Sequence, residues 1–174
     1  MVERRRWFER RFEAGLPAGA LPDLLERLRG TPARLEERLR LIPANFLTRR
    51  LEGRWSIQEN VGHLLDLEPL WERRLDDFLA GAGELSPADL TNRKTHEAGH
   101  NEKNLSDLLG AFRSSRLRLV ERLASTPEAV LGRTALHPRL GTPMTLADLA
   151  FFVAEHDDHH LASMTEIVAR LVAG

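Results

Sequence analysis

Residues Leu146–Leu171 read LADLAFFVAEHDDHHLASMTEIVARL, and apolar residues recur in this segment every three or four positions. That spacing predicts an amphipathic α-helix with one apolar face. His156 and His160 fall on this face, because residues four apart lie one turn apart on a helix. A buried imidazole without a partner costs about 1–3 kcal/mol. The two histidines are therefore expected either to be hydrogen-bonded to protein groups or to share a metal ion.

Three other segments show helical periodicity and are separated by proline and glycine residues. They are predicted to be helical over about residues 21–43, 56–80 and 105–123. The second begins with Ser56, and Glu59 follows three residues later, which is a capping-box pattern. The first contains Pro32, so a kink or a restart of the helix is expected near Thr31.

Shorter elements are expected around these helices. Residues 3–14 predict a short N-terminal helix that ends at Gly15, and Ser86–Asp89 predicts a single helical turn. Thr145 and Asp148 are expected to cap the last helix reciprocally, with aspartate in place of the more usual glutamate. No segment shows a pattern typical of a ladder of strands.

Four amphipathic helices without strands predict an all-α fold, and a four-helix bundle is its most economical architecture. The connections over residues 81–104 and 126–143 are too long for tight turns, so at least one of them is expected to cross over. The 174 residues are expected to form a single domain, 1–174, with residues 1–16 as an N-terminal helical extension.

The composition is that of an ordinary globular protein, with 42% hydrophobic and 29% charged residues. The formal net charge is −1, so no nucleic-acid or membrane partner is expected. The chain contains no cysteine, so any thiol in its chemistry must come from outside. Since no apolar run is long enough for a signal sequence or a membrane span, a cytoplasmic location is expected.

His63 lies in the 56–80 segment, toward the edge of its apolar stripe. Three neutral imidazoles from two facing helices, with an open coordination position, form the kind of site that catalytic Zn²⁺ and similar ions use. The alternative is three hydrogen-bonded core histidines, because helical histidines without a metal are common. The spacing favours a metal site formed by His63, His156 and His160.

The string HEAGH at His96–His100 matches the zinc-protease pattern HExxH literally. Its surroundings are polar and contain glycine, so it lacks the apolar flanks of a buried helix, and a protease is not expected. For His100 and Asn101 a solvated loop is favoured over a place in the pocket wall. His159 projects away from its neighbour His160 and is expected to flank the site rather than to bind the metal.

Asp157 returns to the apolar face of the last helix, where an unpaired carboxylate is costly. An ion pair with Arg113 or Arg116 of the preceding helix is the favoured interpretation. A hydrogen bond to a ligand imidazole and a general-base role are the alternatives. Asp158 faces away from the apolar stripe and is expected to contact water.

The N-terminal sequence places five arginines around Trp7, Phe8 and Phe12, and three glutamates dilute their charge. The three aromatic residues are expected to dock against the bundle or against a second subunit. A homodimer is the expected assembly. The turn-rich segment His137–Pro143 is expected to border a pocket beside the last helix.

Several motifs match one known family. They are WSI at Trp55–Ile57 with GHLLD at Gly62–Asp66, FRSSR at Phe112–Arg116 and EHDDHH at Glu155–His160. Over about residues 20–172 the chain resembles the DinB-like family of metal-binding four-helix bundles. The resemblance implies an up-up-down-down bundle with long crossover connections. It also implies a divalent ion, often nickel, zinc or iron, held at His63, His156 and His160.

This family includes bacillithiol- and mycothiol-linked enzymes, among them thiol S-transferases and a maleylpyruvate isomerase. The first hypothesis is therefore a metal-dependent thiol S-transferase or hydrolase, whose partners are a small electrophile and, for transfer, a low-molecular-weight thiol. The second is a non-catalytic metal- or small-ligand-binding protein of the stress response. A polar-lined pocket beside the metal favours the enzyme, and a fourth protein ligand or a closed pocket favours the binder. A third hypothesis, a nucleic-acid-binding damage-response protein, rests on the family name and the arginine-rich terminus alone.

Overall fold

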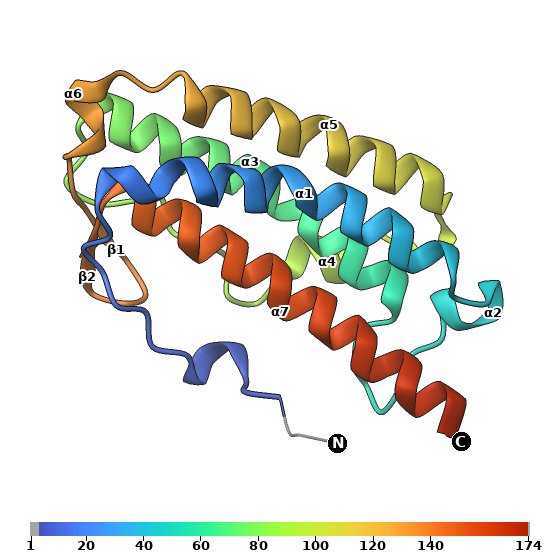
Figure 1. Cartoon of the computed structure of the whole chain (residues 1–174). Coiled ribbons are helices and arrows are strands. Elements are labelled where there is room, and N and C mark those ends of the chain that lie inside the picture. Colours follow the sequence, from blue (N-terminus) through green and yellow to red (C-terminus); the bar gives the residue numbers. More distant parts are fainter. Residues whose placement is uncertain (1–3, 174) are drawn as a thin grey trace.

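The computed structural model describes residues 4–173, and four long helices lie side by side in it (Figure 1). They are α1 (Leu21–Arg40), α3 (Ile57–Ala80), α5 (Leu105–Ala124) and α7 (Leu146–Ala173). Shorter elements in the described residues are η1 (Trp7–Glu9), η2 (Ala18–Ala20), α2 (Ala44–Leu47), α4 (Arg93–Glu97), η3 (His100–Glu102), α6 (Glu128–Leu131), β1 (Ala135–His137) and β2 (Thr142–Met144). The predicted four-helix bundle is confirmed.

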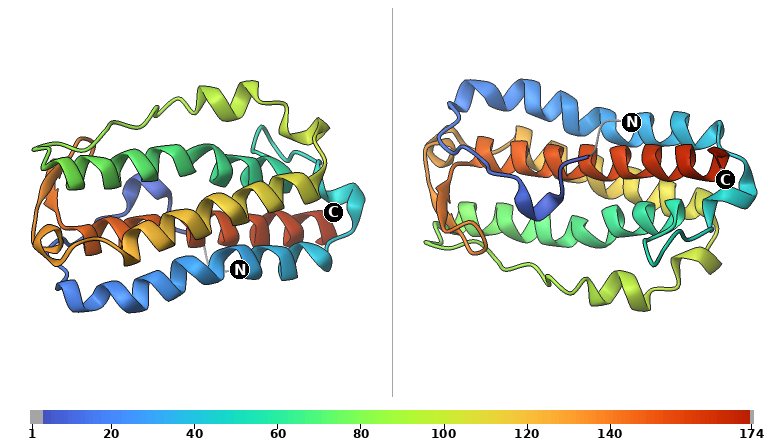
Figure 2. Two further views of the ribbon diagram at one scale, coloured as in Figure 1. Left: turned by 90° about the horizontal axis from the view of Figure 1, so that it is seen from above. Right: turned by 90° about the horizontal axis from the view of Figure 1, so that it is seen from below.

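The long helices form two parallel pairs. α1 and α7 run in one direction along the bundle, and α3 and α5 run in the other (Figures 1 and 2). α1 packs against α5 and α7, and α3 packs against the same two helices. In chain order the directions are therefore up, down, down, up, and around the bundle they are up, up, down, down. The connection of residues 81–104 joins two parallel helices and runs the length of the bundle, so it is the expected crossover.

Side-chain caps start two of the long helices where the sequence predicts them. The hydroxyl of Ser56 accepts the backbone N–H of Glu59 at 3.1 Å, and the Glu59 carboxylate accepts the backbone N–H of Ser56 at 2.8 Å. Thr145 and Asp148 exchange the equivalent hydrogen bonds at 3.2 and 2.8 Å. Gly81, with φ of 70°, ends α3 in the left-handed conformation that glycine adopts without strain. Both capping predictions are confirmed.

α1 is continuous, so the expected restart of the helix near Thr31 is wrong. Pro32 lies inside the helix, where it removes one backbone hydrogen bond. Leu28 and Leu35, one turn before and one turn after it, are completely buried. Burial of these flanking leucines in the bundle keeps the helix in one piece despite the proline.

The predicted N-terminal helix over residues 3–14 is wrong. Residue 3 lies outside the described part, and the rest forms only η1 and extended chain. Trp7 and Phe12 pack on Phe152 of α7, with ring centres 5.1 and 4.8 Å from its ring. The docking prediction is confirmed for these two residues, whereas Phe8 is 61% exposed. Contacts with α7 therefore replace local helical hydrogen bonds in this segment.

The helical turn predicted at Ser86–Asp89 is also wrong, and the chain turns a few residues later, at α4. Asp89 accepts the backbone N–H groups of Thr91 and Arg93 at 2.9 and 3.0 Å. Its carboxylate thus initiates the following turn instead of ending the predicted one.

A small hairpin in the connection before α7 was not expected. β1 and β2 pair antiparallel with Ala135 opposite Met144, and Gly141 takes a φ of 64° in the loop between them. Strands of three residues are too short to show an alternating pattern, so the sequence carries no clear signal for them.

Apolar side chains fill the interior in two clusters. On α7, the buried residues of one cluster end at Ala154 and those of the other begin at Met164, and His156 and His160 lie between them. The histidines therefore occupy the middle layer of the bundle. None of the helices within residues 4–173 has the length and apolar character of a membrane span.

Candidate metal centre

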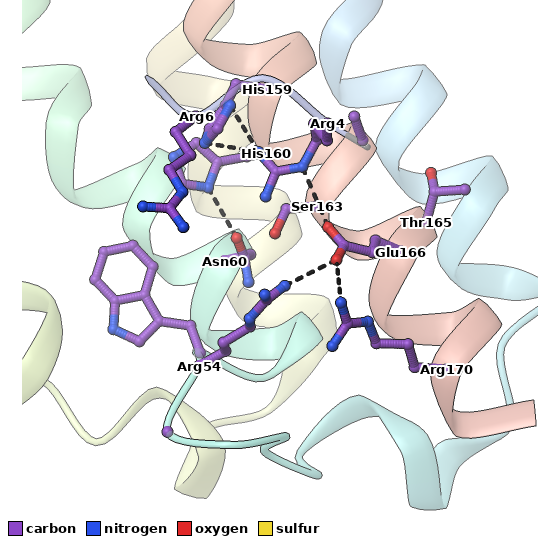
Figure 3. Close-up of a pocket in the computed structure, with 13 residues that line it drawn as sticks. Arg4, Arg6, Arg54, Asn60, His159, His160, Ser163, Thr165, Glu166 and Arg170 are labelled. Carbon is purple, nitrogen blue, oxygen red and sulfur yellow. Dashed lines mark hydrogen bonds and ion pairs between the residues drawn. The ribbon is translucent and has the colours of Figure 1, made fainter. Parts of the chain in front are cut away.

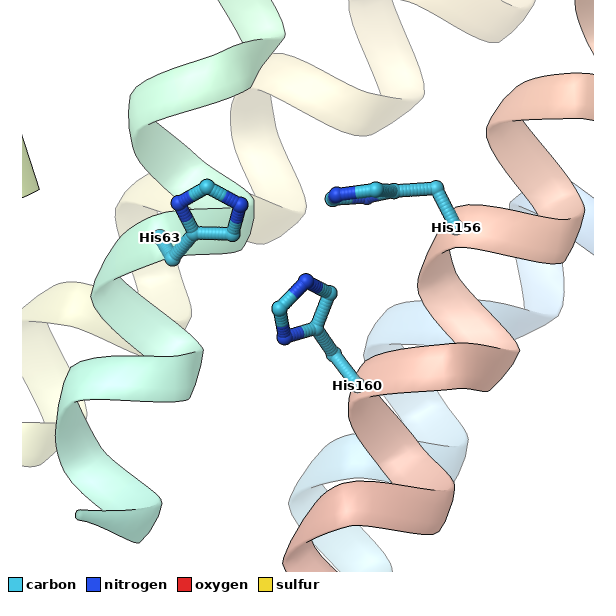
Figure 4. A group of neighbouring side chains, drawn as sticks. All are labelled: His63, His156 and His160. Atoms are coloured by element: carbon cyan, nitrogen blue, oxygen red, sulfur yellow. The ribbon is translucent and has the colours of Figure 1, made fainter. Parts of the chain in front are cut away.

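Three buried imidazoles meet between α3 and α7 (Figure 4). His63 comes from α3, and His156 and His160 come from successive turns of α7. One ring nitrogen of each lies within 4.8 Å of the other two. The ring centres are 4.5–5.3 Å apart. The three histidines are thus brought together within reach of a single ion.

α4 orients the ring of His63. The hydroxyl of Thr95 donates to Oδ2 of Asp66 at 2.9 Å, so it accepts a hydrogen bond from Nδ1 of His63 at 3.0 Å. The ring proton is therefore on Nδ1, and Nε2 keeps a free lone pair. Asp66 is held in turn by Nε2 of His100 at 2.8 Å.

Asn60 has the same effect on His160. Its amide nitrogen donates to the carbonyl oxygen of Ser56 at 2.7 Å, so its own oxygen accepts from Nδ1 of His160 at 2.8 Å. By contrast, Nδ1 of His156 is buried and has no hydrogen-bond partner among residues 4–173. An orphaned nitrogen of this kind is costly unless a further group binds the ring.

Burial keeps the three rings uncharged. Desolvation lowers the pKa of His63 to about 4, and it lowers the pKa values of His156 and His160 well below the usual 6.5. Neutral imidazole is the form that binds a metal. Three neutral nitrogen donors, two of them with oriented lone pairs, fit a divalent ion such as zinc, nickel or iron.

A cavity of about 410 Å³ opens beside the cluster and is lined by all three histidines. Its apolar walls include Trp7, Trp55, Leu67, Leu70, Trp71 and Phe152. Toward the hairpin end of the bundle it is lined by Arg74, His137 and Arg139, so the segment His137–Pro143 borders the pocket as predicted. No fourth histidine or carboxylate within the described residues joins the cluster.

A wider groove of about 1060 Å³ also reaches His160 (Figure 3). Arg4, Arg54 and Arg170 converge there on Glu166, with nitrogen–oxygen distances of 3.4, 2.9 and 2.9 Å. The Glu166 carboxylate thus neutralises part of the arginine charge in this groove.

Sequence comparison places this arrangement in a family. The sequence model of the DinB superfamily matches residues 27–164, which is most of the chain. The chain belongs to the DinB superfamily. This confirms the resemblance carried by the sequence motifs. A comparison with curated proteins finds no match.

Two solved structures show how far the DinB likeness extends. YfiT from Bacillus subtilis, a probable metal-dependent hydrolase with an unusual four-helix bundle topology, matches with a TM-score of 0.77 and 20% identity over 93% of each chain. The mycothiol-dependent maleylpyruvate isomerase matches with a TM-score of 0.65 and 16% identity, over 89% of this chain and 67% of the isomerase chain. At these identities the similarity shows a shared fold.

In this DinB chain Asp157 forms the predicted ion pair, and its partner is Arg116 rather than Arg113. Arg116 donates from Nη2 to Oδ1 of Asp157 at 3.0 Å and from Nη1 to Oδ2, and the hydroxyl of Thr31 donates to Oδ2 at 3.0 Å. Arg116 also binds Glu68 at 2.6 Å. Both carboxylate oxygens of Asp157 are therefore engaged in a structural network, which argues against a general-base role.

Two neighbours of the clustered histidines also have partners. A third of the Asp158 side chain is exposed, so it contacts water as expected, and it also pairs with Arg27 and, at 2.7 Å, with Arg34. His159 lies outside the three-histidine cluster, and its Nδ1 is 2.8 Å from Nη1 of Arg4.

The HExxH string does not form a second centre. His96 is exposed, whereas only 2% of His100 is exposed, and neither belongs to the metal cluster. The solvated-loop interpretation is therefore wrong for His100. Its ring instead contacts the carboxylate of Asp66. Asp66 also accepts the hydroxyl of Thr95, the residue that orients His63.

Sequence reasoning missed Asn60, Thr95 and Arg74. Asn60 lies three residues before His63 on the same helix, and this spacing is a signal that points to a shared helix face. Thr95 and Arg74 are isolated polar residues whose partners lie in distant segments, so no local pattern indicates them.

Proposed function

We propose that this chain binds a divalent metal ion through His63, His156 and His160 and that it is a metal-dependent hydrolase or thiol S-transferase acting on small electrophiles. The observation that carries this proposal is a cluster of three neutral imidazoles that opens onto a cavity of about 410 Å³. Catalytic metal sites combine three protein ligands with an open position in this way.

The residues around the cluster have separate tasks in this proposal. Thr95 and Asn60 hold the rings of His63 and His160 so that Nε2 faces the shared space. Trp55 covers the cluster, with its ring centre 4.5 Å from that of His63, and limits the access of water. A bound divalent ion supplies Lewis-acid chemistry, which makes water or a thiol nucleophilic near neutral pH.

The nucleophile in this proposal is water for hydrolysis or an external low-molecular-weight thiol for transfer. The chain has no cysteine, so no side chain provides the thiol. An open pocket and the lack of a fourth ligand among residues 4–173 favour an enzyme over a non-catalytic metal-binding protein.

The first experiment measures metal content of the untagged protein by elemental analysis. We expect about one divalent ion per chain in the wild type and little or none in His63→Ala, His156→Ala and His160→Ala. The control is His96→Ala, which removes an exposed histidine outside the cluster and is expected to retain the metal. A wild type without metal, even after reconstitution, would refute the site.

The second experiment assays the metal-loaded protein with activated esters and alkylating agents, with and without added thiol. Turnover that requires the metal and is lost in His160→Ala supports the enzyme. If turnover rises with thiol concentration, the transferase is the better description; if it does not, the hydrolase is. Stoichiometric metal without turnover of any substrate in the series would instead identify a metal-binding protein.

A further inference from the structure

We propose that the hairpin end of the 410 Å³ pocket is an anion subsite, in which Arg74, His137 and Arg139 bind the carboxylate of a small apolar substrate. The inference rests on the proposed function only for the role of the bound molecule as substrate. The subsite itself is built from residues outside the histidine cluster.

Arg74 is a buried charge without a carboxylate partner. Only 1% of it is exposed, and Asp77, the acidic group that acts on it through its charge, lies beyond ion-pair distance. The Nε of Arg74 donates to the carbonyl oxygen of Ser86 at 2.9 Å, and its Nη1 lies 3.0 Å from Nε2 of His137. Desolvation lowers the pKa of Arg74 to about 10, so it stays charged at neutral pH. Such a cation is costly unless an anion joins it.

The other buried arginine shows what full compensation looks like in this protein. Arg116 has no exposed surface, and both Glu68 and Asp157 bind it. Arg74 has no carboxylate in contact with it; the face of Trp71, whose ring centre is 5.4 Å from its guanidinium carbon, and the more distant charge of Asp77 compensate it only in part. The difference indicates that the second charge at Arg74 comes from outside the chain.

His137 adds an unsatisfied donor at the same place. Its Nδ1 is approached by the backbone N–H groups of Arg139 and Leu140 at 3.2 and 3.3 Å, while its Nε2 faces Nη1 of Arg74. Burial and the neighbouring arginines lower the pKa of His137 to about 4, so the ring is neutral and offers one lone pair. N–H groups of the protein point at both ring nitrogens of His137, but only one of these nitrogens has a lone pair. At the other nitrogen two N–H donors therefore face each other. A carboxylate oxygen accepting from Arg74 and His137 would resolve this conflict.

Arg139 supplies the third group. Its Nη2 is buried and has no hydrogen-bond partner among the described residues. Its guanidinium carbon lies 5.9, 5.3 and 5.8 Å from the ring centres of Trp7, Phe8 and Phe152. Aromatic rings hold this cation at the pocket wall, but none of them can accept its free N–H bonds as an anion does.

The pocket runs from the arginines at its hairpin end to the histidine cluster, and the space between these two ends suits a short apolar molecule. Trp71 contacts both, because its ring centre is 5.4 Å from the guanidinium carbon of Arg74 and 5.7 Å from the ring centre of His156. A ligand whose carboxylate binds the arginines therefore places its apolar body along Trp71 and Phe152 and its other end beside the histidines. This predicts small aryl or alkyl carboxylates as the substrate class.

The arginine groove beside His160 is a weaker candidate for this role. Figure 3 shows Arg4, Arg54 and Arg170 directed at Glu166, so a carboxylate of the chain already occupies the place that a ligand anion would take.

The test titrates metal-free, chelator-treated protein with benzoate and with its neutral analogue benzamide, using isothermal titration calorimetry. All three tryptophans line the pocket, so their fluorescence gives a second readout. We expect benzoate to bind at least about tenfold more tightly than benzamide, because the hydrogen bonds are charge-assisted. Arg74→Met and the half-buried Arg139→Met are each expected to weaken benzoate binding by about tenfold or more.

The matched control is Arg73→Met, which removes an exposed positive charge next to Arg74 and should leave benzoate affinity unchanged. The titration uses metal-free protein, so a failed metal site would not affect this result. Equal affinity for benzoate and benzamide, affinity unaffected by both arginine variants, or binding only to the metal-loaded protein would each overturn the subsite.

Discussion

Single hydrogen bonds to Nδ1 decide which nitrogen each candidate ligand presents. His63 and His160 have such bonds to Thr95 and Asn60, whereas the Nδ1 of His156 has none among the described residues. In metal sites these outer bonds fix the tautomer and the direction of the ring, and their loss weakens metal binding.

Thr95→Val tests this at the level of one side chain. The substitution keeps the shape of a buried residue but removes the acceptor for His63, so we expect metal affinity to fall about 10- to 100-fold. Competition with a chelating chromophore measures the change. Thr134→Val, at an exposed position outside the site, is the control. Equal metal affinity of both variants would mean that Thr95 does not orient the ligand.

The crossover segment packs closely against α3, and such close packing requires a small residue at the point of contact. Gly62 of α3 is one of these, because a Cβ atom built on it would lie 2.2 Å from Cγ of His100. The crossover segment, which carries both His100 and Thr95, therefore packs directly on the helix backbone.

Gly62→Ala is expected to reduce the free energy of unfolding by about 1–3 kcal/mol, since the buried His100 ring must move. Gly110→Ala on α5 is the matched control, because nothing lies within 4 Å of its Cβ position. There the higher helix propensity of alanine is expected to add up to about 1 kcal/mol. Urea denaturation compares the two, and a stabilising effect of Gly62→Ala would contradict the close packing.

One buried network joins all four long helices. Arg116 of α5 binds Glu68 of α3 and Asp157 of α7, and Thr31 of α1 also donates to Asp157. Removing one member of a buried ion pair leaves the other charge uncompensated, which costs far more than losing an exposed pair.

Arg116→Met is therefore expected to lower the free energy of unfolding by about 3–5 kcal/mol. Arg113→Met, also on α5, removes a partly exposed pair with Glu36 of α1 and should cost less than about 1 kcal/mol. Chemical denaturation of both variants measures the contrast. Similar losses in the two variants would show that burial does not determine how much an ion pair contributes to the free energy of unfolding.

At the scale of the whole molecule, buried titratable groups set the dependence of stability on pH. The pKa is lowered by desolvation for five histidines, which are His63, His137, His156, His159 and His160. The unfolded chain takes up these protons near pH 6.5, and the folded protein resists them. Their contribution to stability is fully present above pH 6.5 and is lost as the pH falls through about 4.

Glu68 acts in the opposite direction. Desolvation raises its pKa to about 7 from 4.5, so its contribution is fully present below pH 4.5 and is lost as the pH rises through about 7. The combined effect of the five histidines on the free energy of unfolding exceeds the opposite effect of the one carboxyl group. We expect the free energy of unfolding of the metal-free protein to fall on acidification, with a slope of about 1.4 kcal/mol per pH unit for each net proton.

Urea denaturation at a series of pH values measures this slope. Glu68→Gln should make the acid loss steeper, because it removes the opposing group. Stability that is constant or rises on acidification would show that these histidines are not held neutral by the fold.

Short-range spacing was enough to predict much of the architecture. Each long helix is encoded by residues three and four apart, and each cap by residues three apart, so neighbours along the chain carry the signal. The same local geometry put His156 and His160 on one face. His63 needed one further step, the expectation that its helix faces the last one, and the family resemblance supported that expectation.

Contacts between distant segments were settled only by packing. Burial against other helices decides three of these features. They are the continuity of α1 through Pro32, the extended course of the N-terminal residues and the pairing of Asp157 with Arg116 rather than Arg113. The convergence of Arg74 and His137, which are 63 positions apart in the chain, is of the same kind. Isolated polar residues have no periodicity, and a charge loses its water only once the chain has folded around it, so the sequence carries no local trace of such a site.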